Sequence, residues 1–454
     1  MSPRRLASVA AGCLTAICIT VSAPATSRAQ TTTHPLAATA VRASQETSDF
    51  SVEGVRVILR RSTANDVVAA NLYLLGGTQQ LTPASQGIET MLLVASEHGT
   101  RRYGKTALRD LTARLGSDIV IEPGVDWTMI GARSLRSTLD STWAVLADRV
   151  MAPRLDSNEV ELVRAQLLSE ARTRRDSPDA LVAALADSAR WMGHPYALEP
   201  VGTEESISRL TLADLRRYER EQMVTSRMLV VIVGNVDRAA AERLVGTTIG
   251  RLPRGSYRWT APASLAPGRS SLTVAARKLP TNYLLGYYGG PPASSADYPA
   301  LRVATAVLSG RLFSEIRSRR NLTYAVDAPF VERAVSVGGL YVTTTQPDLT
   351  LGLIQAEVAR LQQEILDPPG LERLVQQFIT EYFLNNETNA AQANFVARAA
   401  LYRGNAAAAN EFVDELRAVS PADVQRVART YMRGIRFAYV GDPALAPRRI
   451  VDKF

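Results

Sequence analysis

Residues 87–100 read GIETMLLVASEHGT, a mostly apolar run framed by Gly87 and Gly99. The run contains one histidine, His98, and the chain has only two others, His34 and His194. Hydrolysis at a zinc ion needs two imidazoles four residues apart on one helical face, with a carboxylate that takes a proton from the bound water. No two histidines of this chain have that spacing. The sequence therefore predicts that the chain alone does not hydrolyse peptides at zinc.

The frame of this stretch nevertheless resembles a known zinc site. The first active-site helix of the insulinase/pitrilysin zinc peptidases (inverzincins) reads G-x-x-H-x-x-E-H-x-x-x-x-G-T, an inverted zinc motif. Aligned on the flanking glycines, the two histidine positions hold Thr90 and Val94, and the catalytic glutamate position holds Leu93. None of these three side chains can bind zinc or accept the proton. The resemblance thus implies a homologue of the family that lacks the H-x-x-E-H motif.

Two further positions bear on the metal. The third ligand in active relatives is a glutamate on a later helix, and the family spacing from Val94 lands next to Glu170, which we interpret as a remnant. A lone carboxylate does not hold zinc against water. A shifted register ending in Glu97-His98 still has valine at its first histidine position and breaks the glycine spacing. Either register leaves at most one imidazole, so we expect no cofactor bound by this chain.

A second motif lies in the other half of the chain. Residues 309–317 read SGRLFSEIR and are followed, after six intervening residues, by Tyr324. They resemble the family's second-domain motif R-L-f-x-x-i-R-x-x-x-x-l-x-Y. In active members that arginine and tyrosine are thought to hold the substrate backbone and to steady the tetrahedral intermediate, which suits a guanidinium fork and a phenol donor. The resemblance gives this role to Arg317 and Tyr324; without it, they read as an exposed arginine and a half-buried tyrosine.

Two shorter segments also resemble the family, and the resemblance extends over about residues 51–442. His194-Pro195-Tyr196, followed by Gly202-Thr203-Glu204, is similar to its hP-y…G-t-e-e segment. His194 is far from any second histidine, so we interpret it as a structural loop residue. Residues 116–119, Gly-Ser-Asp-Ile, stand where active members place an Asn-Ala edge strand that pairs with the peptide. The missing Asn-Ala pair weakens the expectation of cleavage in this half.

The two halves of the chain repeat the same order of elements. Residues 72–77 and 284–290 are both aliphatic and aromatic runs that end in two glycines. Residues 212–215 and 421–424 each precede a strand that ends at a glycine. Chance similarity of short runs is the alternative, but the shared order predicts duplication. The resemblance implies an α+β fold: two duplicated mixed α/β sandwich domains of the insulinase/mitochondrial-processing-peptidase type, each a sheet with helices packed on one side.

The chain divides into five expected parts. They are a signal peptide at residues 1–29, a flexible lead at 30–50, a first insulinase-like domain with a degenerate zinc site at 51–252, a Pro- and Gly-containing linker at 253–268, and a second domain with the Arg/Tyr motif at 269–454. The signal is predicted from two arginines followed by an apolar run and small-residue cleavage sites. A transmembrane anchor is the alternative, because the apolar run is long for a signal core.

The amino-acid composition limits the classes of protein to which the chain can belong. At 454 residues with 46% apolar and 21% charged residues, the chain is typical of a two-domain globular protein. Both cysteines, Cys13 and Cys18, fall in the signal, so the exported chain is expected to contain no disulfide or thiol nucleophile. Lipidation at Cys13 is a weaker alternative. Loss of three signal arginines lowers the formal charge from +8 to +5. The arginines of the chain are scattered along the sequence, a distribution that does not favour nucleic-acid binding.

These observations predict a non-catalytic subunit of a heterodimeric insulinase-type zinc peptidase, periplasmic or secreted in a bacterium. The chain is expected to close over a peptide substrate and to supply Arg317 and Tyr324 to the active site of a partner that carries the zinc. Contact with a membrane is expected only through an uncleaved or lipidated N-terminus. The main alternative is a stand-alone scaffolding or peptide-binding protein with the same fold. An enzyme with unrelated chemistry is disfavoured, because the chain has no G-x-S-x-G elbow.

Overall fold

The computed structural model describes residues 47–454, and residues 45–454 form one compact unit. The predicted signal peptide and residues 30–46 of the predicted lead lie outside the described residues. The first strand, β1 (Thr47–Val52), begins inside the predicted lead. It pairs antiparallel with β2 (Val55–Arg61) across a tight turn in which Glu53 and Gly54 adopt positive φ angles. That backbone pairing gives residues 47–50 a fixed place that their polar composition does not reveal.

The first sheet has six strands in the order β1-β2-β6-β3-β5-β4. Its remaining members are β3 (Val67–Leu75), β4 (Asp118–Pro123), β5 (Trp127–Leu135) and β6 (Met228–Gly234). Strands β2 and β6 are parallel, and the other neighbours are antiparallel. β6 reads MLVVIVG and is buried along its whole length, as expected for a central strand covered on both faces. β4 is an edge strand, at the place that the family resemblance gave it.

The second sheet repeats this plan. Its strands are β7 (Ser271–Ala276), β8 (Asn282–Pro292), β9 (Val326–Asp327), β10 (Phe330–Val331), β11 (Val335–Thr344) and β12 (Arg436–Gly441). The order is β10-β11-β8-β12-β7, and only β12 and β7 are parallel. The series β7-β12-β8-β11-β10 therefore matches β2-β6-β3-β5-β4 in order and direction. The duplicated α+β fold predicted from the sequence is confirmed.

The helices follow the same repeat. Those of the first half are α1 (Ile88–Ser96), α2 (Lys105–Leu115), α3 (Leu139–Met151), α4 (Ser157–Asp176), α5 (Pro178–Arg190), α6 (Glu204–Arg209), α7 (Leu212–Gln222) and α8 (Arg238–Gly246). The second half contains α9 (Asp297–Leu312), the π-helix η6 (Phe313–Arg319), α10 (Pro347–Gln363), α11 (Pro368–Asn385), α12 (Asn389–Tyr402), α13 (Phe412–Arg417), α14 (Pro421–Tyr431) and α15 (Arg448–Val451). The matching helices α7 and α14 both begin with a capping box, at Thr211 and Ser420.

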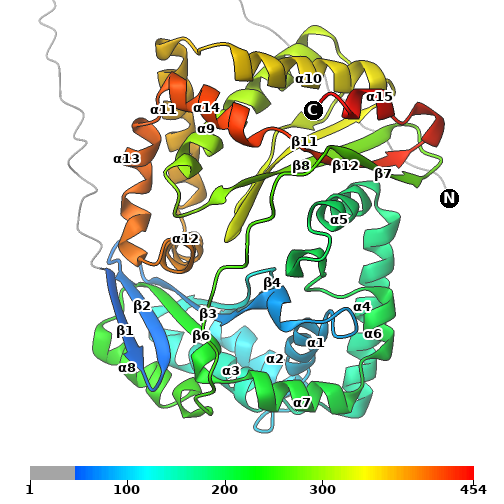
Figure 1. Cartoon of the computed structure of the whole chain (residues 1–454). Coiled ribbons are helices and arrows are strands. Elements are labelled where there is room, and N and C mark those ends of the chain that lie inside the picture. The colour runs from blue at the N-terminus through cyan, green and yellow to red at the C-terminus, as the bar shows by residue number, and fades with distance from the viewer. Residues whose placement is uncertain (1–46) are drawn as a thin grey trace, which may run out of the picture. The chain divides into compact units, whose positions relative to one another are not determined.

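One helix of each half packs on the sheet of the other half (Figure 1). Helix α12 lies against β3 and β6 of the first sheet, and α5 lies against β8 and β12 of the second. The faces that they cover are apolar, with Ile58 and Val231 buried in one and Val337 and Ala438 in the other. The expectation of helices on one side of each sheet is thus incomplete. Neither sheet can leave its second apolar face in water, so each is covered by a helix from the other half.

The stretch between the two sheets, residues 252–270, contains no helix or strand. It includes the predicted linker. Within the described part of the chain, no helix is long and apolar enough to cross a membrane.

Candidate functional site

Helix α1, the counterpart of the zinc helix, is buried in the hydrophobic core of the first half. Leu93 is 2% exposed and belongs to the main apolar cluster of the first half, and Val94 packs against that cluster. The hydroxyl of Thr90 donates a hydrogen bond to the carbonyl oxygen of Pro200 at 2.7 Å. These side chains offer no zinc donor set, so this face of α1 does not fit the metal.

The buried ion pair of α1 is a contact that the sequence reasoning missed. Glu89 accepts hydrogen bonds from Arg227 at 3.0 Å and from the Tyr218 hydroxyl at 2.9 Å, and all three side chains are buried. Burial, reinforced by the negative charge of Glu89, raises the pKa of Tyr218 well above its ordinary value. The contact joins α1 to α7 and to the start of β6. A charged residue within an apolar helix is the sequence signal that could have revealed it.

Helix α4 does not present Glu170 to α1. The buried face of α4 contains Leu167 and Ala171, whereas Glu170 is exposed and accepts a hydrogen bond from Gln166 at 3.0 Å. Ala171, the residue next to the predicted remnant, lies in the core that α4 shares with α1. Within residues 47–454, no group of three or more His, Cys, Asp or Glu side chains is arranged to hold a metal ion.

The two described histidines have structural contacts. His98 pairs with Glu159, which also binds Lys105. His194 accepts a hydrogen bond from the backbone N–H of Tyr196 through Nδ1, so its proton lies on Nε2, which faces the carbonyl oxygen of Ala263 at 3.1 Å. Burial lowers the pKa of His194. This neutral imidazole ties the loop after α5 to the stretch between the two sheets, in keeping with a structural role.

Arg317 and Tyr324 are both available on the surface of the second half. Arg317 is exposed within η6, and Tyr324, five residues after that helix ends, is 84% exposed. Backbone hydrogen bonds from Asn321 to Arg317 and from Leu322 to Ile316 turn the chain back at this point. A tyrosine normally buries most of its ring, so one this exposed is typical of a contact surface.

The neighbours of Arg317 leave its guanidinium free. The nearest carboxylate on η6, Glu315, is bound by Arg319 at 3.1 Å and by Arg320 at 2.8 Å. Those hydrogen bonds, Arg320 first, lower the pKa of the Glu315 carboxyl. The Arg317 guanidinium instead lies 5.0 Å from the ring centre of Phe313, a cation–π contact. The ring contact holds the Arg317 guanidinium in place, and no carboxylate of the described residues neutralises its positive charge.

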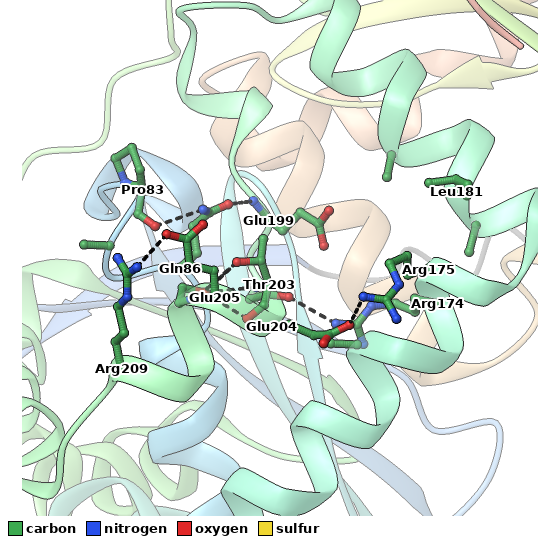
Figure 2. Close-up of a pocket in the computed structure, with 16 residues that line it drawn as sticks. Pro83, Gln86, Arg174, Arg175, Leu181, Glu199, Thr203, Glu204, Glu205 and Arg209 are labelled. Atoms are coloured by element: carbon green, nitrogen blue, oxygen red, sulfur yellow. Dashed lines mark hydrogen bonds and ion pairs between the residues drawn. The ribbon is translucent and has the colours of Figure 1, made fainter. Parts of the chain in front are cut away.

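Two cavities meet beside α1. The first, about 570 Å³, lies between α4, α5 and the segment that leads into α6 (Figure 2). The second, about 700 Å³, runs from that segment to the β4–β5 turn and to residues of the second half. The residues that line both are Gln86, Ala184, Glu199 and Thr203. Neither Arg317 nor Tyr324 is among the described residues that line them, and the main contacts of η6 are with α9, α10 and β9.

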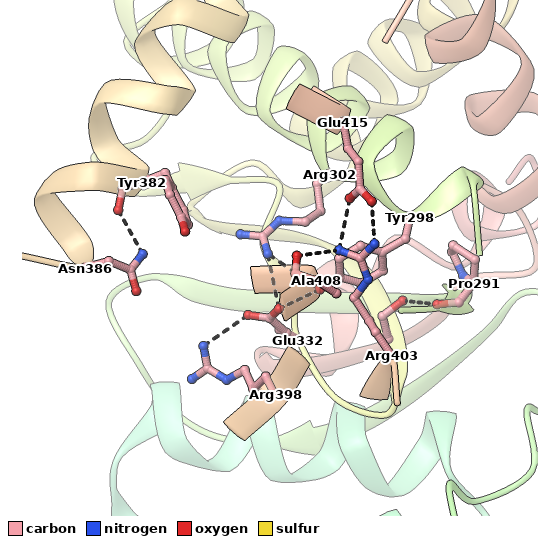
Figure 3. A network of polar contacts seen from close by, with 11 residues as sticks. Pro291, Tyr298, Arg302, Glu332, Tyr382, Asn386, Arg398, Arg403, Ala408 and Glu415 are labelled. Carbon is pink, nitrogen blue, oxygen red and sulfur yellow. Dashed lines mark hydrogen bonds and ion pairs between the residues drawn. The ribbon is translucent and has the colours of Figure 1, made fainter. Parts of the chain in front are cut away.

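The short link between β10 and β11 connects the halves. Glu332 binds Arg302 at 3.3 Å and Arg398, on the crossing helix α12, at 3.1 Å (Figure 3). Burial alone would raise the pKa of the Glu332 carboxyl, but these two guanidinium groups hold it below its usual range. Arg302 also lies 4.9 Å from the ring centre of Phe412.

The next two residues reach the first half. Arg333 makes two hydrogen bonds to Asp187 of α5, at 2.9 and 3.0 Å, and the Ala334 N–H donates to Asp126 at 3.0 Å. Asp126, 3% exposed, also accepts from the Tyr402 hydroxyl at 2.7 Å. Residues 332–334 thus fasten both crossing helices and the β4–β5 turn. No sequence pattern marks this connection, because its partners are distant along the chain.

Comparison with known proteins supports the predicted relationship. Residues 209–378 match the family described as "Peptidase M16 inactive domain". An uncharacterised zinc protease of Mycobacterium leprae is 31% identical over 47% of this chain and 49% of its own length. The mitochondrial-processing peptidase subunit beta of Blastocladiella emersonii is 24% identical over 87% of this chain and 88% of its own.

The solved structures agree on the fold. The crystal structure of a peptidase M16 inactive domain from Pseudomonas fluorescens superposes with a TM-score of 0.81 at 18% identity, covering 87% of this chain and 98% of that one. The sequence matches and this shared two-sheet architecture support the predicted relationship: residues 209–378 are similar to the inactive domain of the insulinase-type (M16) peptidases, and the fold is that of M16 inactive-domain proteins.

Proposed function

We propose that this protein is the non-catalytic subunit of a heterodimeric insulinase-type zinc peptidase. The observation that carries the proposal is a contrast between two sites. The zinc-helix positions Thr90, Leu93 and Val94 are filled by core packing, whereas Arg317 and Tyr324 are exposed and Arg317 has no ion pair among the described residues. A chain of this kind keeps the groups that bind a peptide and has lost the groups that cut it.

In the proposed complex, the partner supplies zinc and the H-x-x-E-H helix. Arg317 holds a carbonyl of the bound peptide through its rigid fork of donors, and the Tyr324 hydroxyl donates to the oxyanion as it forms. Both groups act on charge that develops in the transition state, so their loss lowers turnover more than it weakens the complex. We further propose that the complex works outside the cytoplasm, after export by the N-terminal signal.

A second candidate is a stand-alone scaffolding or peptide-binding protein. The observation in its favour is the set of bonds made by residues 332–334, which fixes the two halves to each other. A scaffold needs such rigidity, but it does not need an arginine without an ion pair and an exposed tyrosine.

The test begins with a pull-down of the tagged full-length protein from its native extract, with zinc content and peptide hydrolysis measured on the eluate. The first candidate predicts a co-purifying chain of similar size, with zinc and activity that the isolated subunit lacks. With the pair in hand, Arg317→Ala should lower turnover about 100-fold and Tyr324→Phe about tenfold. Arg319→Ala is the matched control, because this neighbouring arginine is exposed but already paired with Glu315.

The outcomes separate the two candidates. Loss of turnover with an intact complex supports the role of Arg317 and Tyr324. Equal activity of the wild type and both variants contradicts that role. A lone, zinc-free and inactive protein in the eluate contradicts the heterodimer and favours the scaffold.

A further inference from the structure

The segment between the two cavities is held in a fixed conformation. Its four residues, 199–202, are anchored from three sides. Gln86 accepts a hydrogen bond from the first backbone N–H at 2.7 Å, Thr90 donates to the second carbonyl at 2.7 Å, and Arg174 of α4 donates to the last carbonyl at 3.1 Å. The side chains on this segment are therefore positioned before any ligand arrives.

One of those side chains has no partner. Figure 2 shows the Glu199 carboxylate turned away from Gln86, with no dashed line reaching it. No hydrogen bond or ion pair of this carboxylate is found among residues 47–454. Burial raises the pKa of the Glu199 carboxyl, with Arg174 opposing and Asp187 adding to the shift. The other carboxylates that line the cavities all have partners: Asp126, Asp187, Glu204, Glu205 and Glu332.

We propose that the two cavities form one peptide-binding groove in which Glu199 receives a basic side chain, a lysine or an arginine, of the bound polypeptide. Its place is the junction of the cavities, since Glu199 lines both. The inference rests on that part of the proposed function in which the chain closes over a peptide, and it names which peptides are preferred.

The chemistry of the groove selects this ligand class. A half-buried carboxylate without a partner gains most from a cation that brings its own hydrogen-bond donors. A metal ion is not favoured, because a single carboxylate does not provide a coordination shell. Anionic ligands are disfavoured as well, because the three arginines that line the first cavity are already engaged: Arg174 with a backbone carbonyl, Arg175 with Glu204 and Arg209 with Glu205. The charged groups that face Glu199 are Arg174 of α4 and Asp187 of α5.

The test is a direct binding measurement on the full-length protein, without any partner. Two fluorescein-labelled extended peptides are compared by fluorescence polarisation, one with a central arginine and one with citrulline, its uncharged isostere. The wild type should bind the arginine peptide about tenfold more tightly. Glu199→Gln should remove this preference. Glu161→Gln, which changes an exposed carboxylate of α4 that is already paired with Arg164 and lines neither cavity, should keep it.

A second variant addresses the groove itself. Ala184 of α5 lines both cavities, so Ala184→Leu should weaken binding of both peptides at least severalfold. The melting temperature of each variant is measured alongside. Glu199→Gln should not lower it, because no bond of the carboxylate is lost.

The proposal is overturned if the wild type binds the two peptides equally or not at all, if the preference survives Glu199→Gln, or if Ala184→Leu has no effect. Failure of the proposed heterodimer is seen separately in the pull-down, because the binding measurement uses the isolated chain. Arginine-selective binding together with a pull-down that yields no partner would support the groove and contradict the heterodimer.

Discussion

Helix α1 and the α9–η6 element occupy matching places in the two halves. Each follows the second strand of the repeated sheet pattern, and each packs on a matching pair of helices, α4 and α7 for α1, α11 and α14 for α9. They differ in what they show to solvent. α1 is nine residues long and almost wholly buried, whereas α9 continues into a π-helix that carries the exposed Arg317.

The difference shows how a fold can be retained when the metal-binding residues of one helix are absent. Where the family places ligands, α1 has side chains of a size that the core can absorb, and the helix has become a packing element. The extension η6 places only Ile316 in the core of its half, so its exposed positions gain no stability from becoming apolar. Under the proposed function, the polar groups that bind substrate are retained at exposed positions, where burial does not favour an apolar side chain.

The first way to sharpen the comparison is to remove a carboxylate from each element. Glu89→Ala on α1 leaves the buried Arg227 without its counter-charge and should destabilise the protein by about 3–5 kcal/mol. Glu315→Ala on η6 frees two exposed arginines and should leave the unfolding midpoint nearly unchanged. Urea denaturation followed by circular dichroism measures both. Similar midpoints for the two variants would contradict the contrast.

A second prediction concerns the conversion of α1 into a zinc-binding helix. In a variant carrying Thr90→His, Leu93→Glu and Val94→His, adding Ala171→Glu should raise zinc affinity by about 100-fold or more, since it supplies a ligand from the buried face of α4. Adding Glu170→Gln to the same variant should change nothing. Competition with a coloured chelator gives the affinities, and circular dichroism shows whether zinc restores any lost structure. Equal effects of positions 170 and 171 would refute the assignment of the buried face.

A third prediction concerns how η6 holds its arginine. Phe313→Leu keeps an apolar side chain but removes the ring beneath Arg317, and it should lower turnover of the reconstituted pair about two- to fivefold. Phe313→Trp keeps a ring and should retain activity. The matched control is Phe383→Leu, an exposed phenylalanine on α11. A leucine variant as active as the tryptophan variant would show that the ring does not position Arg317.

The smallest expected effect comes from His194, outside both elements. Burial lowers its pKa below the ordinary value of about 6.5, so the unfolded chain binds a proton more readily than the fold does. Its contribution to stability is therefore complete above about pH 6.5 and falls as the pH drops toward the lowered pKa. Urea midpoints between about pH 7 and pH 5 should fall less steeply in His194→Gln. Parallel slopes would rule out this residue as the cause.

Much of the fold was readable from the sequence because it is repeated and local. Residues 72–75 and 284–290 lie in the matching strands β3 and β8, and residues 212–215 and 421–424 begin the matching helices α7 and α14. The packing of α5 and α12 on the sheet of the opposite half could not be predicted from the sequence. Their apolar faces predict burial, but periodicity does not say which sheet receives them.

The candidate site was readable only where a motif marks it. Arg317 and Tyr324 came from a family pattern, and the structure adds that both are exposed. Glu170 was chosen by counting along the chain, and a shift of one residue on a helix turns a side chain by about 100°, here from the core to solvent. Glu199 had no signal at all, because an unpaired carboxylate is recognised only once every neighbour is placed.

The exchange of helices also sets an order of events during synthesis. The outer face of the first sheet is complete in sequence once β6 has been made, yet α12, which covers it, ends at residue 402. At bacterial or eukaryotic translation speeds, that delay is on the order of 10–30 s. During this time Ile58, Tyr73 and Val231 have no native cover. An apolar surface that is exposed before its cover has been made is a site at which the nascent chain can aggregate.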